Sequence, residues 1–297
     1  MMFTKHTYES GKPGPHLLIT AGVHGDEFES ISAIHRVQSW IRDELIHGTV
    51  TLVPVVNEGA FLRGHRTAED GLDLARTCPG NIDGTITEQT AHYLSELIRT
   101  ADYFIDLHTG GTRISVAPLA GYVLHPNPEV LEPTRKMARA FNLPIIWGTD
   151  WRLEGRSLSI ARDANVPAIY CEYLGGAQCS INGIDAYEKG CKNVMGWLEL
   201  TSHSQPESQV EHFVEDPRPG AGHLQINNPA PFDGVFIASI SLGDAINAGE
   251  TYGTLTTMDG TKSIDLVAET SGIVILIHTF PGVNENDPLC VIMSEPE

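Results

Sequence analysis

The chain has 297 residues, of which 41% are hydrophobic and 19% are charged, a composition typical of a globular protein with a sizeable core. Acidic residues outnumber basic ones by 38 to 19, so the formal charge of −19 repels nucleic-acid phosphates and anionic membrane surfaces. Length, composition and charge therefore exclude a largely disordered chain and argue against nucleic-acid or membrane partners.

The N-terminal residues and the cysteines predict a soluble, cytoplasmic protein. Residues 1–10 hold no apolar stretch of signal-peptide length, and the longest apolar run, residues 272–277, is too short to cross a bilayer. The five cysteines include no Cys-x-x-Cys pair, which favours reduced thiols over a disulfide framework or a thiolate zinc site.

Strand-like runs alternate with helical patterns over residues 16–201, which predicts an α/β fold with a largely parallel sheet. The runs that we expect to form strands are residues 16–23, 49–57, 103–108, 121–125, 144–147 and 167–172. Apolar spacing predicts one helix over residues 28–45 and another that begins at the capping box of Thr85 and Glu88. A last helix is expected over residues 185–197.

Residues 201–220 differ in composition, because Ser, Gln, Glu and Pro dominate and apolar residues are sparse. We therefore expect a linker there, between one domain over residues 1–200 and a small β domain over residues 221–297. Within the β domain, residues 234–242 resemble residues 272–280, which predicts two similar hairpins packed as a small barrel or sandwich.

The pattern of this β domain also resembles the biotinyl/lipoyl-type β fold, whose carrier function needs a lysine at a hairpin tip. Lys262 is the sole candidate in the sequence, and it lacks the usual flanking residues. Since a fold alone does not define a function, we favour a structural or site-shaping role for the β domain.

Candidate metal ligands lie where expected strands end. His24 and Glu27 are three residues apart at a strand-to-helix corner, and His108 ends another apolar strand, where open α/β sheets bind ligands. Two histidines and a carboxylate are the ligand types of hydrolytic zinc sites. Alternatively, His24 is an ordinary loop histidine and Glu27 a carboxylate favoured by the helix dipole. Asp106 is a candidate for orienting the site, or equally a buried structural carboxylate.

Four ordered motifs resemble the succinylglutamate desuccinylase/aspartoacylase family, relatives of the zinc carboxypeptidases. The motifs are His24-Gly-Asp-Glu27, Arg66 followed by Asp73-Leu-Ala-Arg76-Thr-Cys-Pro-Gly, Asp106-Leu-His108-Thr-Gly, and Tyr170-Cys-Glu172-Tyr-Leu-Gly-Gly. Their order and approximate spacing match over residues 15–200. The resemblance implies a zinc-carboxypeptidase-like catalytic domain, with helices on both faces of a mostly parallel sheet, followed by an all-β barrel or sandwich domain.

The same resemblance implies one Zn²⁺ ion per chain, bound by His24, Glu27 and His108. It also implies that Glu172 is the carboxylate that acts on zinc-activated water. Zinc lowers the pKa of its water to about 7, and a neighbouring carboxylate can take the proton and pass it to a leaving amine. The alternative for Glu172 is a strand-end glutamate that pairs with an arginine.

On the long loop after residue 57, the resemblance assigns Arg66 to polarising the scissile carbonyl and Arg76 to holding a substrate carboxylate. Arg63 competes with Arg66 for the first role, and each arginine is alternatively a surface ion pair. The family usually has Asn directly before the second arginine, whereas this sequence has Ala75. Because that amide is missing, the family's best-known substrates do not transfer directly.

Together these residues predict a zinc-dependent amidohydrolase that removes an acyl group from an N-acyl amino acid or a similar small metabolite. One alternative is a metallocarboxypeptidase-like enzyme that cleaves the C-terminal residue from a short peptide. The other is a zinc-binding relative without turnover. The expected partner is a small N-acyl substrate, and the sequence leaves open whether the chain forms a homo-oligomer.

Overall fold

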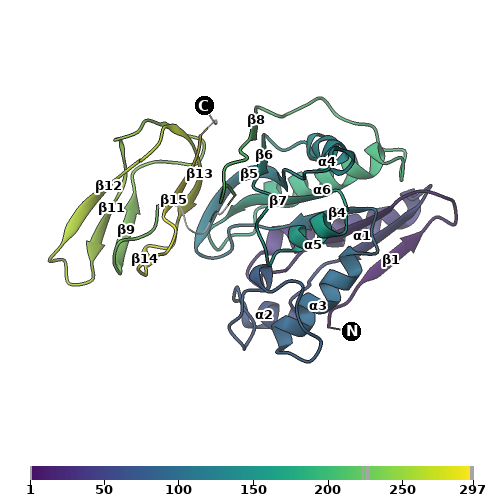
Figure 1. Cartoon of the computed structure of the whole chain (residues 1–297), viewed down its shortest axis with the longest axis horizontal. Helices are drawn as coiled ribbons and strands as arrows, with labels where there is room; N and C mark the ends of the chain where they lie inside the picture. Colours follow the sequence, from purple (N-terminus) through teal and green to yellow (C-terminus); the bar gives the residue numbers. More distant parts are fainter. Residues whose placement is uncertain (1, 223, 225–227, 295–297) are drawn as a thin grey trace.

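The computed structural model describes residues 2–222, 224 and 228–294, and Figure 1 shows an elongated molecule with C-terminal strands at one end. The strands are β1 (His6–Glu9), β2 (His16–Thr20), β3 (Thr49–Val53), β4 (Tyr103–Leu107), β5 (Ile114–Val123), β6 (Ile145–Thr149), β7 (Ala168–Gly175), β8 (His212–Glu215), β9 (Gly234–Ala238), β10 (Ala245–Ile246), β11 (Thr251–Thr257), β12 (Ser263–Val267), β13 (Gly272–His278), β14 (Gly282–Val283) and β15 (Cys290–Met293). The helices are α1 (Phe28–Glu44), α2 (Glu58–Arg63), the 3-10 helix η1 (Leu74–Arg76), α3 (Ile86–Ile98), α4 (Pro128–Phe141), α5 (Ser157–Asp163) and α6 (Ile181–Trp197).

An eleven-stranded sheet forms the centre of the fold, with β1-β3-β2-β4-β7-β5-β13-β10 as its main path. The run β3-β2-β4-β7 is parallel, and so is the run β5-β6-β8, whereas β5 lies antiparallel to β7. Parallel neighbours need crossover connections, and most of the helices lie in those connections. The expectation of a mixed α/β fold with a mostly parallel sheet is therefore confirmed for this part of the chain.

Helices cover both faces of the sheet. Leu17 and Ile19 of β2 pack into a core with residues of α1, α4 and α6, whereas Leu18 packs on the opposite face with residues of α3 and α5. Because both faces of β2 are buried, its sequence is a continuous apolar run instead of an alternating one. Within the described ranges, no helix has the length and apolar character needed to cross a bilayer.

The parallel register brings the carboxyl ends of β2, β4 and β7 to one edge of the sheet. Thr20 of β2 lies opposite Asp106 of β4, and Leu107 of β4 lies opposite Cys171 of β7. The residues that follow these positions in the chain therefore meet at the same edge, which is where open α/β sheets bind ligands.

The C-terminal strands contribute to two sheets. A four-stranded sheet has the order β12-β11-β9-β14, while β10, β13 and β15 join the main sheet through β13, in which Leu276 lies opposite Val116 of β5. Phe236 of β9 and Val274 of β13 share one core, so the two sheets pack as a sandwich. The two segments that resemble each other in sequence contain β9 and β13, and they lie in different sheets.

Other differences from the expected elements have local causes. The strand expected from residue 121 begins at Ile114, because β13 from the far end of the chain pairs with its first residues. α6 begins four residues earlier than expected, since the side chain of Ser180 accepts a hydrogen bond from the Gly183 amide and caps the helix. β8 lies inside the expected linker and pairs with β6, and the division into domains at residues 201–220 stays a prediction.

Leu276 tests whether the C-terminal strands and the α/β part unfold together. Its side chain is fully buried beside Trp147 and Val116. All four tryptophans precede residue 201, so tryptophan fluorescence follows the α/β part alone. We expect Leu276→Ala to leave a cavity and lower the free energy of unfolding in urea, followed by fluorescence, by about 2–5 kcal/mol.

The control for this experiment is Met258→Ala, because Met258 is 84% exposed and its loss should change the free energy by no more than about 0.5 kcal/mol. If Leu276→Ala leaves the fluorescence transition unchanged, the C-terminal strands unfold separately.

Candidate metal centre and active-site pocket

His24 and Glu27 lie on the turn that joins β2 to α1. Glu27 is the N-cap residue of α1 and has an extended backbone. Gly25, between them, packs against α2 so closely that a Cβ atom would lie 2.0 Å from the carbonyl carbon of Ala60. The turn therefore requires glycine at this position, and it directs the side chains of His24 and Glu27 into one buried space.

His108 directly follows β4 and is fixed by its backbone. Its amide donates a hydrogen bond of 2.8 Å to the carbonyl of Cys171 in β7, and the Tyr187 hydroxyl donates one to the carbonyl of His108. These two hydrogen bonds hold His108 at the same sheet edge as the turn after β2.

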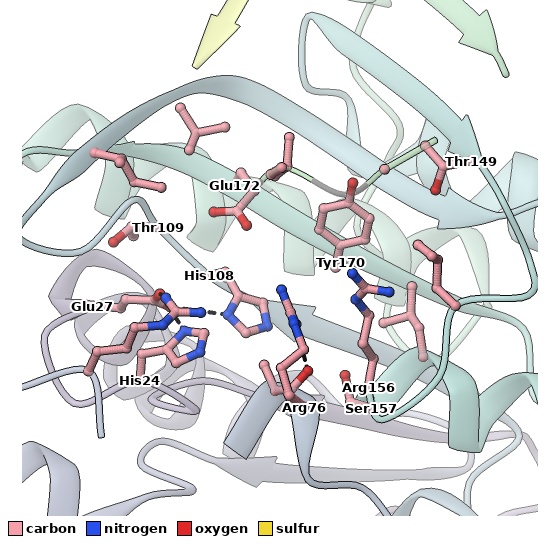
Figure 2. Close-up of a pocket in the computed structure, with 18 of the residues that line it drawn as sticks. His24, Glu27, Arg76, His108, Thr109, Thr149, Arg156, Ser157, Tyr170 and Glu172 are labelled. Atoms are coloured by element: carbon pink, nitrogen blue, oxygen red, sulfur yellow. Dashed lines mark hydrogen bonds and ion pairs between the residues drawn. The ribbon is translucent and has the colours of Figure 1, made fainter. Parts of the chain in front are cut away.

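The side chains of His24, Glu27 and His108 form a buried cluster, which Figure 2 shows on one side of the pocket. Nδ1 of His24 lies 2.6 Å from Oε1 of Glu27, and Nδ1 of His108 lies 3.1 Å from Oε2 of Glu27. The three ligand atoms lie within 4.8 Å of one another. The structure thus brings together the three residues that the sequence suggests as metal ligands.

An aspartate holds the outward nitrogen of each histidine. Nε2 of His24 lies 3.1 Å from Oδ1 of Asp73, and Nε2 of His108 lies 3.1 Å from Oδ2 of Asp106. Carboxylates in this position orient a metal-ligating histidine and raise the basicity of its other nitrogen. Two inward imidazole nitrogens with a carboxylate oxygen between them form a donor set that fits zinc.

The charge state of Glu27 also suits a metal ligand. Burial acts to raise the pKa of Glu27, but the positive charges of His24 and His108 outweigh it and hold the pKa well below its usual range. The buried side chain is therefore a carboxylate when the imidazoles are protonated, and a bound cation would supply the positive charge in their place once they are neutral.

Glu172 lies on β7 and lines the pocket beside this cluster. Burial raises the pKa of its carboxyl group to about 7. Its Oε2 atom is buried and accepts no hydrogen bond from any residue that the structure describes. The strand continues past Glu172 to Gly175, beyond the end expected at residue 172, because β5 pairs antiparallel with this extension.

Arg66 reaches the ligand cluster and is anchored there by Asp73. Its Nε and Nη2 atoms donate to Oδ2 of Asp73 at 3.2 and 2.9 Å, and its Nη1 atom lies 4.0 Å from Oε1 of Glu27. Arg63 is exposed at the end of α2 and does not line the pocket, so the geometry favours Arg66 of the two. Sequence reasoning gave Asp73 no role, since only the fold shows that it contacts both His24 and Arg66.

The pocket continues along β7 toward the predicted residue Arg76 and toward Arg156, which sequence reasoning missed. Tyr170 and Glu172 are two residues apart and face the same side of the strand, and Arg156 enters beside Tyr170 (Figure 2). Arg76 and Ala75 line the pocket from η1. Arg156 carried no signal in the sequence, because the helix that it precedes, α5, was not among the expected elements.

The fold and the site define a mixed α/β protein with a buried cluster of two histidines and a glutamate at a sheet edge. The sequence profile of the succinylglutamate desuccinylase/aspartoacylase catalytic domain matches residues 13–198. The chain therefore belongs to the succinylglutamate desuccinylase/aspartoacylase family, and the resemblance seen in four motifs is confirmed.

A curated relative covers almost the whole chain. The N-α-acetyl-L-2,4-diaminobutyric acid deacetylase of Halomonas elongata is 29% identical in an alignment of 290 residues that covers 94% of this chain and 82% of that protein.

Two solved structures share the fold. The succinylglutamate desuccinylase/aspartoacylase of Rhodobacter sphaeroides has a TM-score of 0.88 at 24% identity, over 99% of this chain and 89% of that one. The product-bound ectoine utilization protein EutE (DoeB) of Ruegeria pomeroyi has a TM-score of 0.86 at 24% identity, over 97% of this chain and 87% of that one.

Asp73→Asn tests the support that Asp73 gives to His24 and Arg66. The substitution keeps the size of the side chain and removes its charge, so the outward nitrogen of His24 loses its carboxylate. We expect zinc affinity to fall about 10- to 100-fold, measured by competition with a chromophoric chelator. Asp83→Asn is the matched control, because Asp83 is exposed on the same loop. Equal zinc affinity in the two variants would contradict this role of Asp73.

Proposed function

We propose that the chain is a zinc-dependent hydrolase that removes the acyl group from an N-acyl amino acid or a similar small metabolite. Support comes from membership of a family whose name joins a desuccinylase and an aspartoacylase, and from similarity to a deacetylase of an N-acetylated diamino acid. The observation that carries the proposal is the buried cluster of two histidines and a glutamate beside Glu172 in one pocket.

In this proposal one zinc ion is held by His24, Glu27 and His108. Zinc, when bound, polarises a carbonyl and acidifies water. The chain supports that ion through Asp73 and Asp106, which hold the outward nitrogens of the two histidines. The ligand cluster is largely buried, so the groups that act there do so with little competition from bulk solvent.

Glu172 moves the proton in this mechanism. A carboxyl group with a pKa of about 7 is populated in both protonation states near neutral pH. Its carboxylate accepts a proton from the water that attacks the amide carbonyl, and its carboxylic acid then donates that proton to the amine that leaves. The unpartnered Oε2 atom is available for this exchange.

The arginines orient and stabilise the substrate. Arg66, held by Asp73 next to Glu27, donates to the carbonyl oxygen as negative charge develops on it. Arg76 forms a forked, charge-assisted contact with a carboxylate of the substrate.

Glu172→Gln tests the proton transfer. Gln keeps the shape of the side chain and cannot exchange a proton near neutral pH, so we expect turnover to fall by about 10²- to 10⁴-fold. Zinc content, measured by mass spectrometry after dialysis, should equal that of the unchanged protein. Retained turnover in the zinc-loaded variant would remove Glu172 from the mechanism.

The reaction itself is tested with zinc-loaded protein and a mixed panel of N-acyl amino acids, N-acyl diamines and short peptides, with products identified by mass spectrometry. We expect loss of an acyl group that depends on Glu172. Loss of C-terminal residues from the peptides would identify a peptidase instead, and no change in any compound would favour a zinc-binding protein without turnover.

A further inference from the structure

Apart from the residues near the candidate metal, the pocket is lined mainly by apolar side chains and two arginines. Figure 2 shows Arg76 beside His108 and Arg156 beside Tyr170. The larger apolar residues of the lining are Ile114, Val116, Val123, Leu153, Leu158 and Leu224, and Thr149, Ser157 and Tyr170 add polar groups. A ligand that reaches from the metal cluster into this part of the pocket therefore meets positive charge and apolar surface.

Arg156 has a guanidinium group that forms no ion pair with a described residue, although the charge of Asp73 acts on it. It is half-buried on the loop between β6 and α5, and no residue that the structure describes accepts a hydrogen bond from its side chain. Burial lowers the pKa of Arg156, because the charged form is partly removed from water. A partly desolvated guanidinium without an acceptor is stabilised when a ligand supplies a carboxylate.

Arg76 and Arg156 line the same pocket, and their like charges repel. Burial, followed by the charge of Arg156, lowers the pKa of Arg76 to about 10. An anionic group placed between the two guanidiniums would relieve this repulsion and form charge-assisted hydrogen bonds with both.

The described lining of the pocket offers no further acidic group for a cationic side chain. Among the described residues that line it, only Glu27 and Glu172 carry carboxylates, and the proposed function uses both. The segment from residue 217 to residue 232, part of which lines the pocket, contains no Asp or Glu in its sequence. A buried ammonium group would therefore face two arginines without a further carboxylate in the described lining to pair with it, which is costly.

We propose that the substrate is an N-acyl α-amino acid with an uncharged, apolar side chain, whose single carboxylate is clamped between Arg76 and Arg156. Arg156 supplies the hydrogen-bond donors that Ala75, at the position of the family's usual asparagine, lacks. The apolar residues that line the pocket contact the amino-acid side chain of the substrate. This inference rests on the proposed deacylase activity and specifies its substrate class.

The inferred substrate of this chain differs from the substrate in the name of the Halomonas elongata relative. The acetylated substrate in that protein's name, 2,4-diaminobutyrate, has a second amine that is cationic at neutral pH. The pocket of this chain should disfavour that compound, because its ammonium group would approach Arg76 and Arg156.

The test uses the zinc-loaded full chain and four N-acetyl compounds that differ in one group. N-acetyl-L-norvaline is compared with N-α-acetyl-L-2,4-diaminobutyrate, with N-acetyl-L-glutamate and with N-acetyl-L-norvalinamide, which lacks the carboxylate. We expect kcat/KM for N-acetyl-L-norvaline to exceed that for each of the others by at least about tenfold. Faster hydrolysis of the diaminobutyrate compound would overturn the inference, and so would faster hydrolysis of the glutamate compound, since the two arginines would then hold separate carboxylates.

Arg156→Met tests the clamp. We expect KM for N-acetyl-L-norvaline to rise about 10- to 100-fold, with kcat changed much less and with hydrolysis of the amide unaffected. Arg156→Lys, which keeps the charge and loses the forked geometry, should give an intermediate KM. The control is Arg152→Met, because Arg152 lies on the same loop, is bound to Asp150 and does not line the pocket.

An equal loss of activity on acid and amide in Arg156→Met would mean that Arg156 has only a structural role. Calorimetric binding of N-acetyl-L-norvaline and its amide to zinc-loaded Glu172→Gln protein, with and without Arg156→Met, separates this inference from the proposed function. If the acid binds more tightly through Arg156 but no compound is hydrolysed by the unchanged protein, the carboxylate clamp is supported and the deacylase activity fails. If acid and amide bind equally, the clamp is wrong whatever the activity.

Discussion

Buried negative charge at the carboxyl edge of the sheet is the constraint on which the rest of the site depends. The Glu27 side chain is 1% exposed, and Asp73 and Asp106 lie behind the two histidines that contact it. Carboxylates in such a place are costly unless positive groups accompany them. Arg66 supplies positive charge, and so would the proposed zinc ion, while the two histidines can donate ring N–H hydrogen bonds to Asp73 and Asp106.

The charge of the groups that line the pocket changes along β7, from the carboxylate of Glu172 to the guanidinium group of Arg156 beside Tyr170. The carboxylate of Glu172 lies near the candidate ligand cluster, whereas Arg76 lies beside His108 and Arg156 beside Tyr170. In the proposed function, an N-acyl amino acid with its amide at the candidate metal site would extend its carboxylate toward these arginines. A single strand, β7, positions both parts of this charge pattern, since Tyr170 and Glu172 face the same side of it.

The sequence predicts the parts of this arrangement that depend on short segments and misses those that depend on distant contacts. The apolar runs before Asp106 and Glu172 locate two strands of the site, and the capping box at Thr85 marks the start of α3. By contrast, the first residues of β5 are paired with β13 from the other end of the chain. The spacing of apolar residues in their own sequence therefore does not predict that they form a strand. Arg156 was missed for a related reason, because its loop is placed by β6 and α5 against the rest of the pocket.

X-ray absorption of the zinc-loaded protein tests the central claim most directly, because it identifies the atoms around the ion without depending on turnover. The account predicts a shell of nitrogen and oxygen atoms only, at about 2.0–2.2 Å, with outer-shell scattering from two imidazole rings that is reduced in His24→Gln and in His108→Gln. A sulfur neighbour at about 2.3 Å would contradict it, because that would place the ion at a cysteine. A shell without imidazole scattering would also contradict it.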